Sequence, residues 1–168
     1  MSVVFNIGYE KTDIVSFIAT LKTVGIECLV DVRAVPQSRK KGFSKKALAT
    51  AVQEAGLKYI HFEELGDPKE GRIAARNGAI KEFVQVYEYH LSKPSAQHAM
   101  KELARLIDKE TCCLMCFERD HTACHRSIIC IKLEEFGITS FQLYGDNPTR
   151  YERHRSKLPR RNTSEGAT

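Results

Sequence analysis

The chain has 168 residues, a length that suits one domain with a sizeable core and is too short for two domains of ordinary size. Its six cysteines form no regular framework and no apolar run approaches membrane-spanning length, which argues against a disulfide-rich secreted scaffold and against a membrane protein. The first residues lack the basic start and long apolar core of a signal peptide, so we expect a cytoplasmic protein with reduced thiols and no membrane partner.

The net charge of +5 is concentrated near the C-terminus. Residues 149–168 contain six basic and two acidic residues, a net charge of 6 − 2 = +4, so residues 1–148 carry only 5 − 4 = +1. We therefore predict an α/β domain over residues 1–148 and a basic, flexible tail over residues 149–168. Such a tail either attracts phosphate backbones or only keeps the chain soluble, and the sequence leaves both interpretations open.

Strand and helix patterns alternate along the chain. Short apolar and β-branched runs predict five strands, at residues 3–7, 28–32, 58–62, 112–117 and 139–144. Apolar residues at helical spacing predict helices at residues 13–24, 44–55, 79–91, 95–109 and 124–136. The polar segment that follows the third strand is predicted to be a mobile loop. The alternation predicts a single three-layer α/β domain, with a mostly parallel sheet of about five strands and helices on both faces.

Polar residues follow the ends of several predicted strands. They are Tyr9 after the first strand, Asp31 and Arg33 at the second, and Cys116 and Glu118 at the fourth. In an open parallel sheet these ends meet at one edge, where ligands bind. Six basic residues and no acidic one lie between Asp31 and Glu54. We therefore predict a positively charged pocket at this edge.

Phosphate is the expected ligand of this pocket. Arg33, Ser38 and Arg126 are predicted to bind it, because a guanidinium donates to two phosphate oxygens at once. Tyr9 is expected to stack on a base or to form a hydrogen bond with it. Asp31 is expected to pair with an arginine and to orient it.

The second half of the site is a strand that runs into a reactive loop and a helix start. Cys124 would sit at the N-terminus of that helix beside His125 and Arg126, a position that favours a thiolate. Cys124 is therefore the candidate nucleophile and Glu118 the candidate base, with Cys116 and His125 completing the catalytic set. The alternative is that Cys124 only packs the turn.

Two other uses of these residues stay open. Cys116, His121, Cys124 and His125 are residue types that bind zinc, but the adjacent Cys124 and His125 are expected to point at one ion only with difficulty. We therefore predict no metal ligand, and the sequence identifies no cofactor. The remaining alternative is a reversible disulfide between Cys116 and Cys124.

The chain also resembles the domain-of-unknown-function family numbered 488. The matching motifs are Ile7-Gly8-Tyr9, residues 29–33 with Pro36, Ser38 and Phe43, Tyr59 with Leu65-Gly66, and residues 114–118 with Cys124-His125-Arg126. Similar proteins usually have a second glycine after Leu65-Gly66, where this chain has Asp67, so this loop is expected to differ. The resemblance implies a site without assigning a reaction.

These observations predict an enzyme that acts on a phosphate-bearing substrate, either a nucleotide or a nucleic acid, although turnover itself is not established by sequence. One alternative is a non-catalytic nucleic-acid binding module that uses the basic tail and the loop at residues 39–41. Another is a thiol redox or zinc-sensing protein. The oligomeric state is not predicted.

Overall fold

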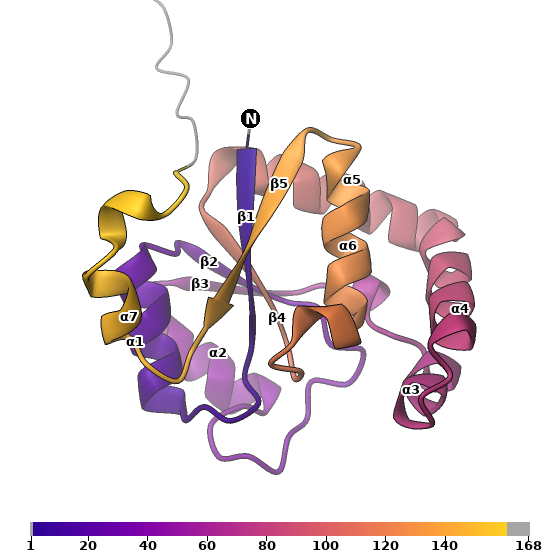
Figure 1. Ribbon diagram of the computed structural model, residues 1–168, viewed down its shortest axis with the longest axis horizontal. Helices are drawn as coiled ribbons and strands as arrows, with labels where there is room; N and C mark the ends of the chain where they lie inside the picture. The colour runs from indigo at the N-terminus through magenta and orange to yellow at the C-terminus, as the bar shows by residue number, and fades with distance from the viewer. Residues whose placement is uncertain (1, 161–168) are drawn as a thin grey trace, which may run out of the picture.

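The computed structural model describes residues 2–160. Five strands form one sheet in the order β3-β2-β4-β1-β5, and every pairing is parallel (Figure 1). The strands are β1 (Ser2–Gly8), β2 (Cys28–Asp31), β3 (Lys58–His61), β4 (Cys112–Cys116) and β5 (Ile138–Tyr144). The predicted α/β fold with a five-stranded parallel sheet is confirmed.

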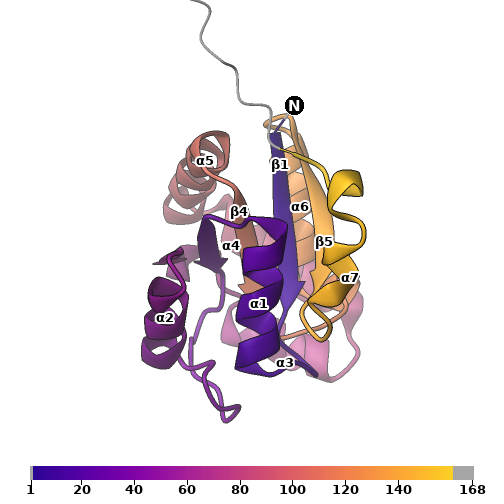
Figure 2. The same ribbon diagram turned by 90° about the vertical axis from the view of Figure 1, so that its left-hand side faces the viewer.

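Helices cover both faces of this sheet, as predicted. One apolar layer lies under α1 (Ile14–Val24), α2 (Lys45–Glu54) and α7 (Thr149–Glu152), which Figure 2 views from the front. The other lies under α4 (Ile80–Ser92), α5 (Pro94–Lys109) and α6 (His125–Glu134). Alternate side chains of each strand enter opposite layers, as the two-residue period of a strand requires. In β4, for example, Leu114 belongs to one apolar cluster and Met115 to the other.

The helix ends follow local sequence signals. Asp13 caps α1 by accepting a hydrogen bond from the Ser16 amide at 2.8 Å. The same helix ends at Gly25, whose φ of +87° is a left-handed conformation that glycine adopts without strain. α5 begins at Pro94, where the missing amide proton costs nothing in the first turn.

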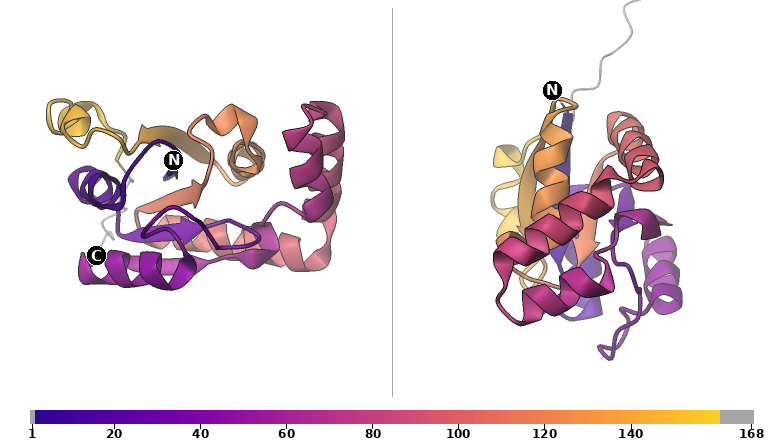
Figure 3. Two further views of the ribbon diagram at one scale, coloured as in Figure 1. Left: turned by 90° about the horizontal axis from the view of Figure 1, so that it is seen from below. Right: turned by 90° about the vertical axis from the view of Figure 1, so that its right-hand side faces the viewer.

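The segment predicted to be a mobile loop is ordered. It forms a short 3₁₀ helix, η1 (Glu63–Leu65), and then α3 (Lys69–Arg76), which lies beside α4 (Figures 1 and 3). The prediction failed because α3 is mostly polar, with only Gly71 and Ala74 buried. This short helix is stabilised by tertiary packing, since Ala74 and Ala75 contact the apolar core.

The start of the predicted tail also has structure. Residues 149–152 form α7, and 155–157 form a further 3₁₀ helix, η3 (Arg155–Lys157). Tyr151 is buried, and its hydroxyl oxygen accepts a hydrogen bond from the Tyr144 amide at 2.7 Å. Residues 161–168 of the tail lie outside the described part of the chain. Within residues 2–160, no helix is long and apolar enough to cross a membrane.

Candidate functional site

A pocket of about 600 Å³ opens at the carboxyl ends of β1, β2 and β4. Five of the predicted site residues line it, namely Tyr9, Arg33, Cys116, Glu118 and His125. They converge because the parallel strands deliver their terminal side chains to one edge of the sheet. Asp67, Arg72 and Arg76 from the segment around α3 complete its polar wall.

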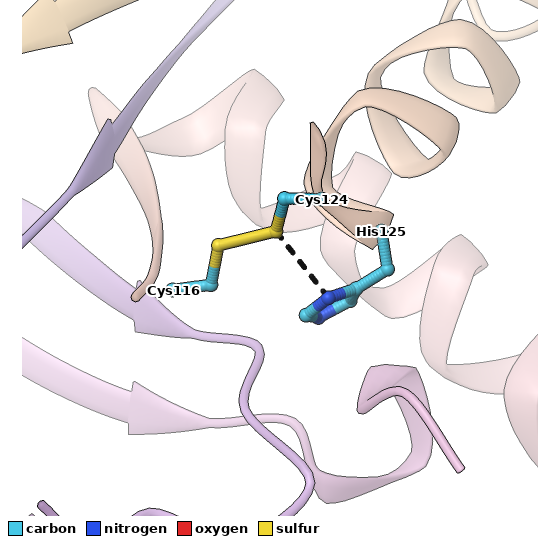
Figure 4. A group of neighbouring side chains, drawn as sticks. All are labelled: Cys116, Cys124 and His125. Carbon is cyan, nitrogen blue, oxygen red and sulfur yellow. Dashed lines mark hydrogen bonds between the residues drawn. A yellow bond between two sulfur atoms is a disulfide. The ribbon is translucent and has the colours of Figure 1, made fainter. Parts of the chain in front are cut away.

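Cys116 and Cys124 meet beside this pocket. Cys116 is the last residue of β4 and Cys124 immediately precedes α6, and the structure joins their sulfur atoms as a disulfide (Figure 4). Both residues are buried. The structure thus contains the Cys116–Cys124 pair that the sequence left as an alternative.

His125 points at this sulfur pair (Figure 4). Its Nδ1 atom lies 3.4 Å from Cys124 Sγ, and its Nε2 atom lies 2.7 Å from the Val32 carbonyl oxygen. A carbonyl oxygen only accepts hydrogen bonds, so Nε2 carries the proton and the Nδ1 lone pair faces the sulfur. Burial lowers the pKa of His125 to about 4, so the ring is neutral at pH 7.

Arg126 is fully buried behind the sulfur pair. Its guanidinium donates to Asn6 Oδ1 at 3.0 Å, Ile7 O at 2.8 Å, Glu118 O at 3.0 Å, Gln142 Oε1 at 3.4 Å and Cys116 Sγ at 3.0 Å. Within residues 2–160, it forms no ion pair with a carboxylate. Of its five acceptors, only the Cys116 sulfur becomes an anion in its reduced form. Arg126 therefore favours a thiolate at Cys116.

Glu118 lies on the pocket side of the same sulfur. Its Oε2 atom is 3.3 Å from Cys116 Sγ, and burial raises the pKa of its carboxyl group. The loop that carries Glu118 crosses closely over Gly8, where an added Cβ atom would lie 1.7 Å from the Glu118 carbonyl oxygen. Gly8 is thus required for the loop to reach the pocket. The predicted base contacts Cys116, whereas Cys124 contacts His125.

Arg33 has a different environment from Arg126. It pairs with both carboxylate oxygens of Asp31, at 2.9 Å and 2.7 Å, and donates to the Phe43 carbonyl oxygen at 2.6 Å. Tyr59 donates a further hydrogen bond to Asp31 at 2.5 Å. The Arg33 guanidinium also lies 5.4 Å from the centre of the Tyr9 ring. These contacts hold Arg33 in the pocket wall and occupy its principal donors.

Ser38 does not line the pocket. Its hydroxyl accepts a hydrogen bond from the Lys40 amide at 3.1 Å, and its own amide donates to Ser44 Oγ at 3.1 Å. It therefore organises the basic loop that precedes α2. Its predicted role in binding an anion has no support from its contacts and stays a prediction.

Sequence reasoning missed three charged residues of the pocket, Asp67, Arg72 and Arg76. Asp67 is only 6% exposed, and its Oδ1 atom has no hydrogen-bond partner within the described residues. Burial raises its pKa to about 7. An added Cβ atom at Gly71 would lie 2.1 Å from this oxygen, so the glycine provides the space that the carboxyl group occupies.

Two signals in the sequence point to these residues. The family resemblance leads us to expect glycine at the position of Asp67, and Arg72 and Arg76 are four residues apart, a spacing that places two side chains on one helix face. The second signal requires a helix over the segment, and that helix was not predicted. In the structure, Arg72 donates to the Asp67 carbonyl oxygen at 3.2 Å, which ties α3 to the preceding loop.

Comparison with protein-family models matches residues 13–133 to the family described as Domain of unknown function DUF488. The matched range spans more than half of the chain and contains most of the pocket residues, Tyr9 being the exception. Comparison with curated proteins finds no match.

Proposed function

The chain belongs to the DUF488 family, whose description assigns no reaction, and we propose from its pocket that it is an enzyme acting on a small phosphate-bearing substrate. One observation carries the proposal. The buried Arg126 has no carboxylate partner within residues 2–160 and lies 3.0 Å from Cys116 Sγ, at the edge of a pocket lined by three further arginines. A cation beside a sulfur at a strand end is the environment of an activated thiol.

Cys116 is the nucleophile in this proposal. In the reduced protein, Glu118 accepts the thiol proton across 3.3 Å, and Arg126 stabilises the resulting thiolate. The thiolate electron pair forms the new bond to the substrate, and the leaving group departs with the electrons of the bond that breaks. The disulfide to Cys124 blocks this step, so the active form is the reduced one.

Arg72 and Arg76 are the anion-binding residues in this proposal. Both line the pocket, and neither forms an ion pair in the described part of the chain. Arg33 and Arg126 contribute their charge, but their donors are directed at protein atoms, so we assign the phosphate to Arg72 and Arg76 instead of to the arginines that the sequence suggested. Arginine suits phosphate because its donors match two of the oxygens.

The apolar edge of the pocket favours a nucleotide among phosphate-bearing substrates. Phe117 lines the pocket and is 46% exposed, and its ring meets the Tyr9 ring edge-on with 5.3 Å between the ring centres. Val35, also in the lining, is 52% exposed. An aromatic base has the flat apolar faces that such an edge accommodates.

Calorimetric titration with adenosine monophosphate and with inorganic phosphate tests the binding step. We expect the double variant Arg72→Ala/Arg76→Ala to lose affinity at least about tenfold for both probes. The matched control is Lys101→Ala/Arg105→Ala, which removes two exposed cations four residues apart on α5 and should bind as the wild type does. Equal affinities in all three proteins would refute the proposed anion site.

A further inference from the structure

We infer that, in the reduced protein, Cys116, Cys124 and His125 form a three-ligand site for a borderline-soft divalent cation such as Zn²⁺, with the fourth coordination position open to the pocket. Two thiolates and a neutral imidazole are ligands that Zn²⁺ prefers, and three protein ligands with one open position are typical of catalytic zinc. The inference goes beyond the proposed function and does not depend on it.

The ligand atoms already lie close together. The two sulfur atoms and the imidazole nitrogen are all within 4.8 Å of one another, and all three residues are buried (Figure 4). Cys124 Sγ lies 3.4 Å from His125 Nδ1. A tetrahedral zinc ion with its usual bond lengths holds a sulfur and a nitrogen roughly 3.6 Å apart. These two side chains are thus already spaced as ligands of one ion.

The adjacent residues converge because the backbone changes conformation between them. Cys124 is extended, with φ −139° and ψ 152°, and His125 is the first residue of α6. The turn from extended to helical backbone brings the two side chains to the same side. The sequence-based expectation that neighbouring residues would not easily face one ion overlooked this change.

The backbone spacing of the cysteines is also compatible with a shared ion. Their Cα atoms are 7.8 Å apart. A disulfide usually joins Cα atoms roughly 4.4–6.8 Å apart, whereas two thiolates on one zinc ion are themselves separated by about 3.8 Å. The longer backbone separation therefore leaves room for an ion between the sulfurs once they are reduced.

Hydrogen bonds with neighbouring protein groups favour the metal-binding forms of the three ligands, a neutral imidazole and two thiolates. The Val32 carbonyl accepts the Nε2 proton of His125, which leaves the Nδ1 lone pair for a metal. Arg126 donates from its side chain to Cys116 Sγ at 3.0 Å and from its amide to Cys124 Sγ at 3.4 Å. Each thiolate thus has a protein donor, and the Arg126 charge offsets one of the two negative charges.

In this site the open position lies on the side of the cavity that Asp67 also lines. Asp67, Glu118, Cys124 and His125 line one cavity of about 320 Å³. Asp67 is 6% exposed and its Oδ1 atom has no hydrogen-bond partner within residues 2–160. A buried polar atom of this kind requires a partner, and a water molecule on the fourth position of the ion supplies one. The cavity is large enough for that water.

A bound ion occupies both sulfurs, so it excludes the disulfide and also blocks the thiol nucleophile of the proposed function. Metal binding is measurable without any phosphate, which separates a failure of this inference from a failure of that proposal. The test uses the full chain, reduced with a phosphine and stripped of metals. It is titrated with Zn²⁺ in a calorimeter and with Co²⁺ in an absorption spectrometer.

We expect one ion per chain and a thiolate-to-Co²⁺ charge-transfer band. Cys116→Ser and Cys124→Ser should each weaken Zn²⁺ binding at least about tenfold and reduce the band. Cys130→Ala is the matched control, because Cys130 is another buried cysteine of α6 outside the ligand set, and it should bind as the wild type does. An equal loss in Cys130→Ala, or no bound ion in the reduced wild type, would overturn the inference.

A second measurement avoids variants that fail to fold. Peptide mapping of the reduced wild type after iodoacetamide treatment should show Cys116 and Cys124 protected by one equivalent of Zn²⁺. Protection should disappear when a chelator removes the ion. Alkylation that proceeds equally with and without Zn²⁺ contradicts the site.

Discussion

The two buried arginines of the pocket region, Arg33 and Arg126, have hydrogen-bond acceptors of different charge. Arg33 is paired with the Asp31 carboxylate through two hydrogen bonds, so its charge is neutralised within the protein. Arg126 is fully buried, and within residues 2–160 its guanidinium donates to neutral oxygens and to the Cys116 sulfur. Burying a charge without a counterion is costly. The cost of burying Arg126 is offset in the reduced protein, where the Cys116 thiolate is the counterion.

This difference gives Arg33 a structural role and Arg126 a chemical role, although the sequence does not distinguish the two residues. Arg33 follows Asp31 at the end of β2 and Arg126 follows Cys124 at the start of α6, and sequence analysis predicted the same anion-binding role for both. The Asp31–Arg33 pair stabilises the wall of the pocket, whereas Arg126 leaves a positive potential directed at one sulfur. The variants below test this contrast.

Removal of Arg126 should have the largest effect. Arg126→Met leaves the acceptors at Asn6, Ile7, Glu118 and Gln142 without their donor, so we expect the free energy of unfolding to fall by about 4–5 kcal/mol. Urea denaturation monitored by circular dichroism measures the change. A loss below about 1 kcal/mol would show that the guanidinium network contributes little to the fold.

Breaking the Asp31–Arg33 pair should cost slightly less. Asp31→Asn leaves Arg33 as an uncompensated buried cation and weakens the hydrogen bond from Tyr59, so we expect a loss of about 3–4 kcal/mol in the same urea experiment. The double variant Asp31→Leu/Arg33→Met removes both charges. It should be less destabilised than Asp31→Asn alone, and a loss of stability equal to or larger than that of Asp31→Asn would disprove the pairing argument.

Asp67 extends the comparison to a buried carboxyl group, whose Oδ1 atom has no hydrogen-bond partner within residues 2–160. Burial raises its pKa from the usual 3.8 to about 7, with the positive charge of Arg72 opposing the shift and the negative charge of Glu118 adding to it. The folded state therefore binds a proton that the unfolded state releases, and stability is lost as the pH rises from about 4 to above 7.

Asp67→Asn should remove this pH dependence. We expect the variant to be about 1–3 kcal/mol more stable than the wild type at pH 8, with the difference shrinking toward pH 4. Urea denaturation at several pH values checks this, with Glu88→Gln as the control at an exposed carboxylate on α4. A stability difference that is the same at pH 4 and pH 8 would argue against a buried, protonated Asp67.

The sequence predicted the sheet and the convergence of its strand ends because hydrophobic periodicity reports which segments are buried. Parallel strands then bring Tyr9, Arg33, Cys116, Glu118 and His125 to one pocket. The sequence did not predict α3, because that helix is only eight residues long and half of its residues are charged, and it is held by its packing beside α4. The wall formed by its arginines was missed for the same reason.

The sequence could not predict that Arg33 and Arg126 have different hydrogen-bond partners, for another reason. Arg33 finds its carboxylate two residues away, which a local pattern suggests. Arg126 is satisfied by Asn6 and Ile7, which precede it by 120 and 119 residues and contact it only because β1 and β4 are paired. Such contacts follow from strand order, which periodicity does not give.

The most direct test of the account is the alkylation rate of Cys116 at neutral pH in reduced, metal-free protein, measured by peptide mass spectrometry in Arg126→Gln and Arg33→Gln variants that remain folded. We predict that Arg126→Gln slows the reaction of Cys116 at least about tenfold, because its thiolate loses the adjacent cation, while Arg33→Gln stays within about twofold of the wild type. Equal rates in the wild type and Arg126→Gln would contradict the claim that Arg126 stabilises a reactive thiolate.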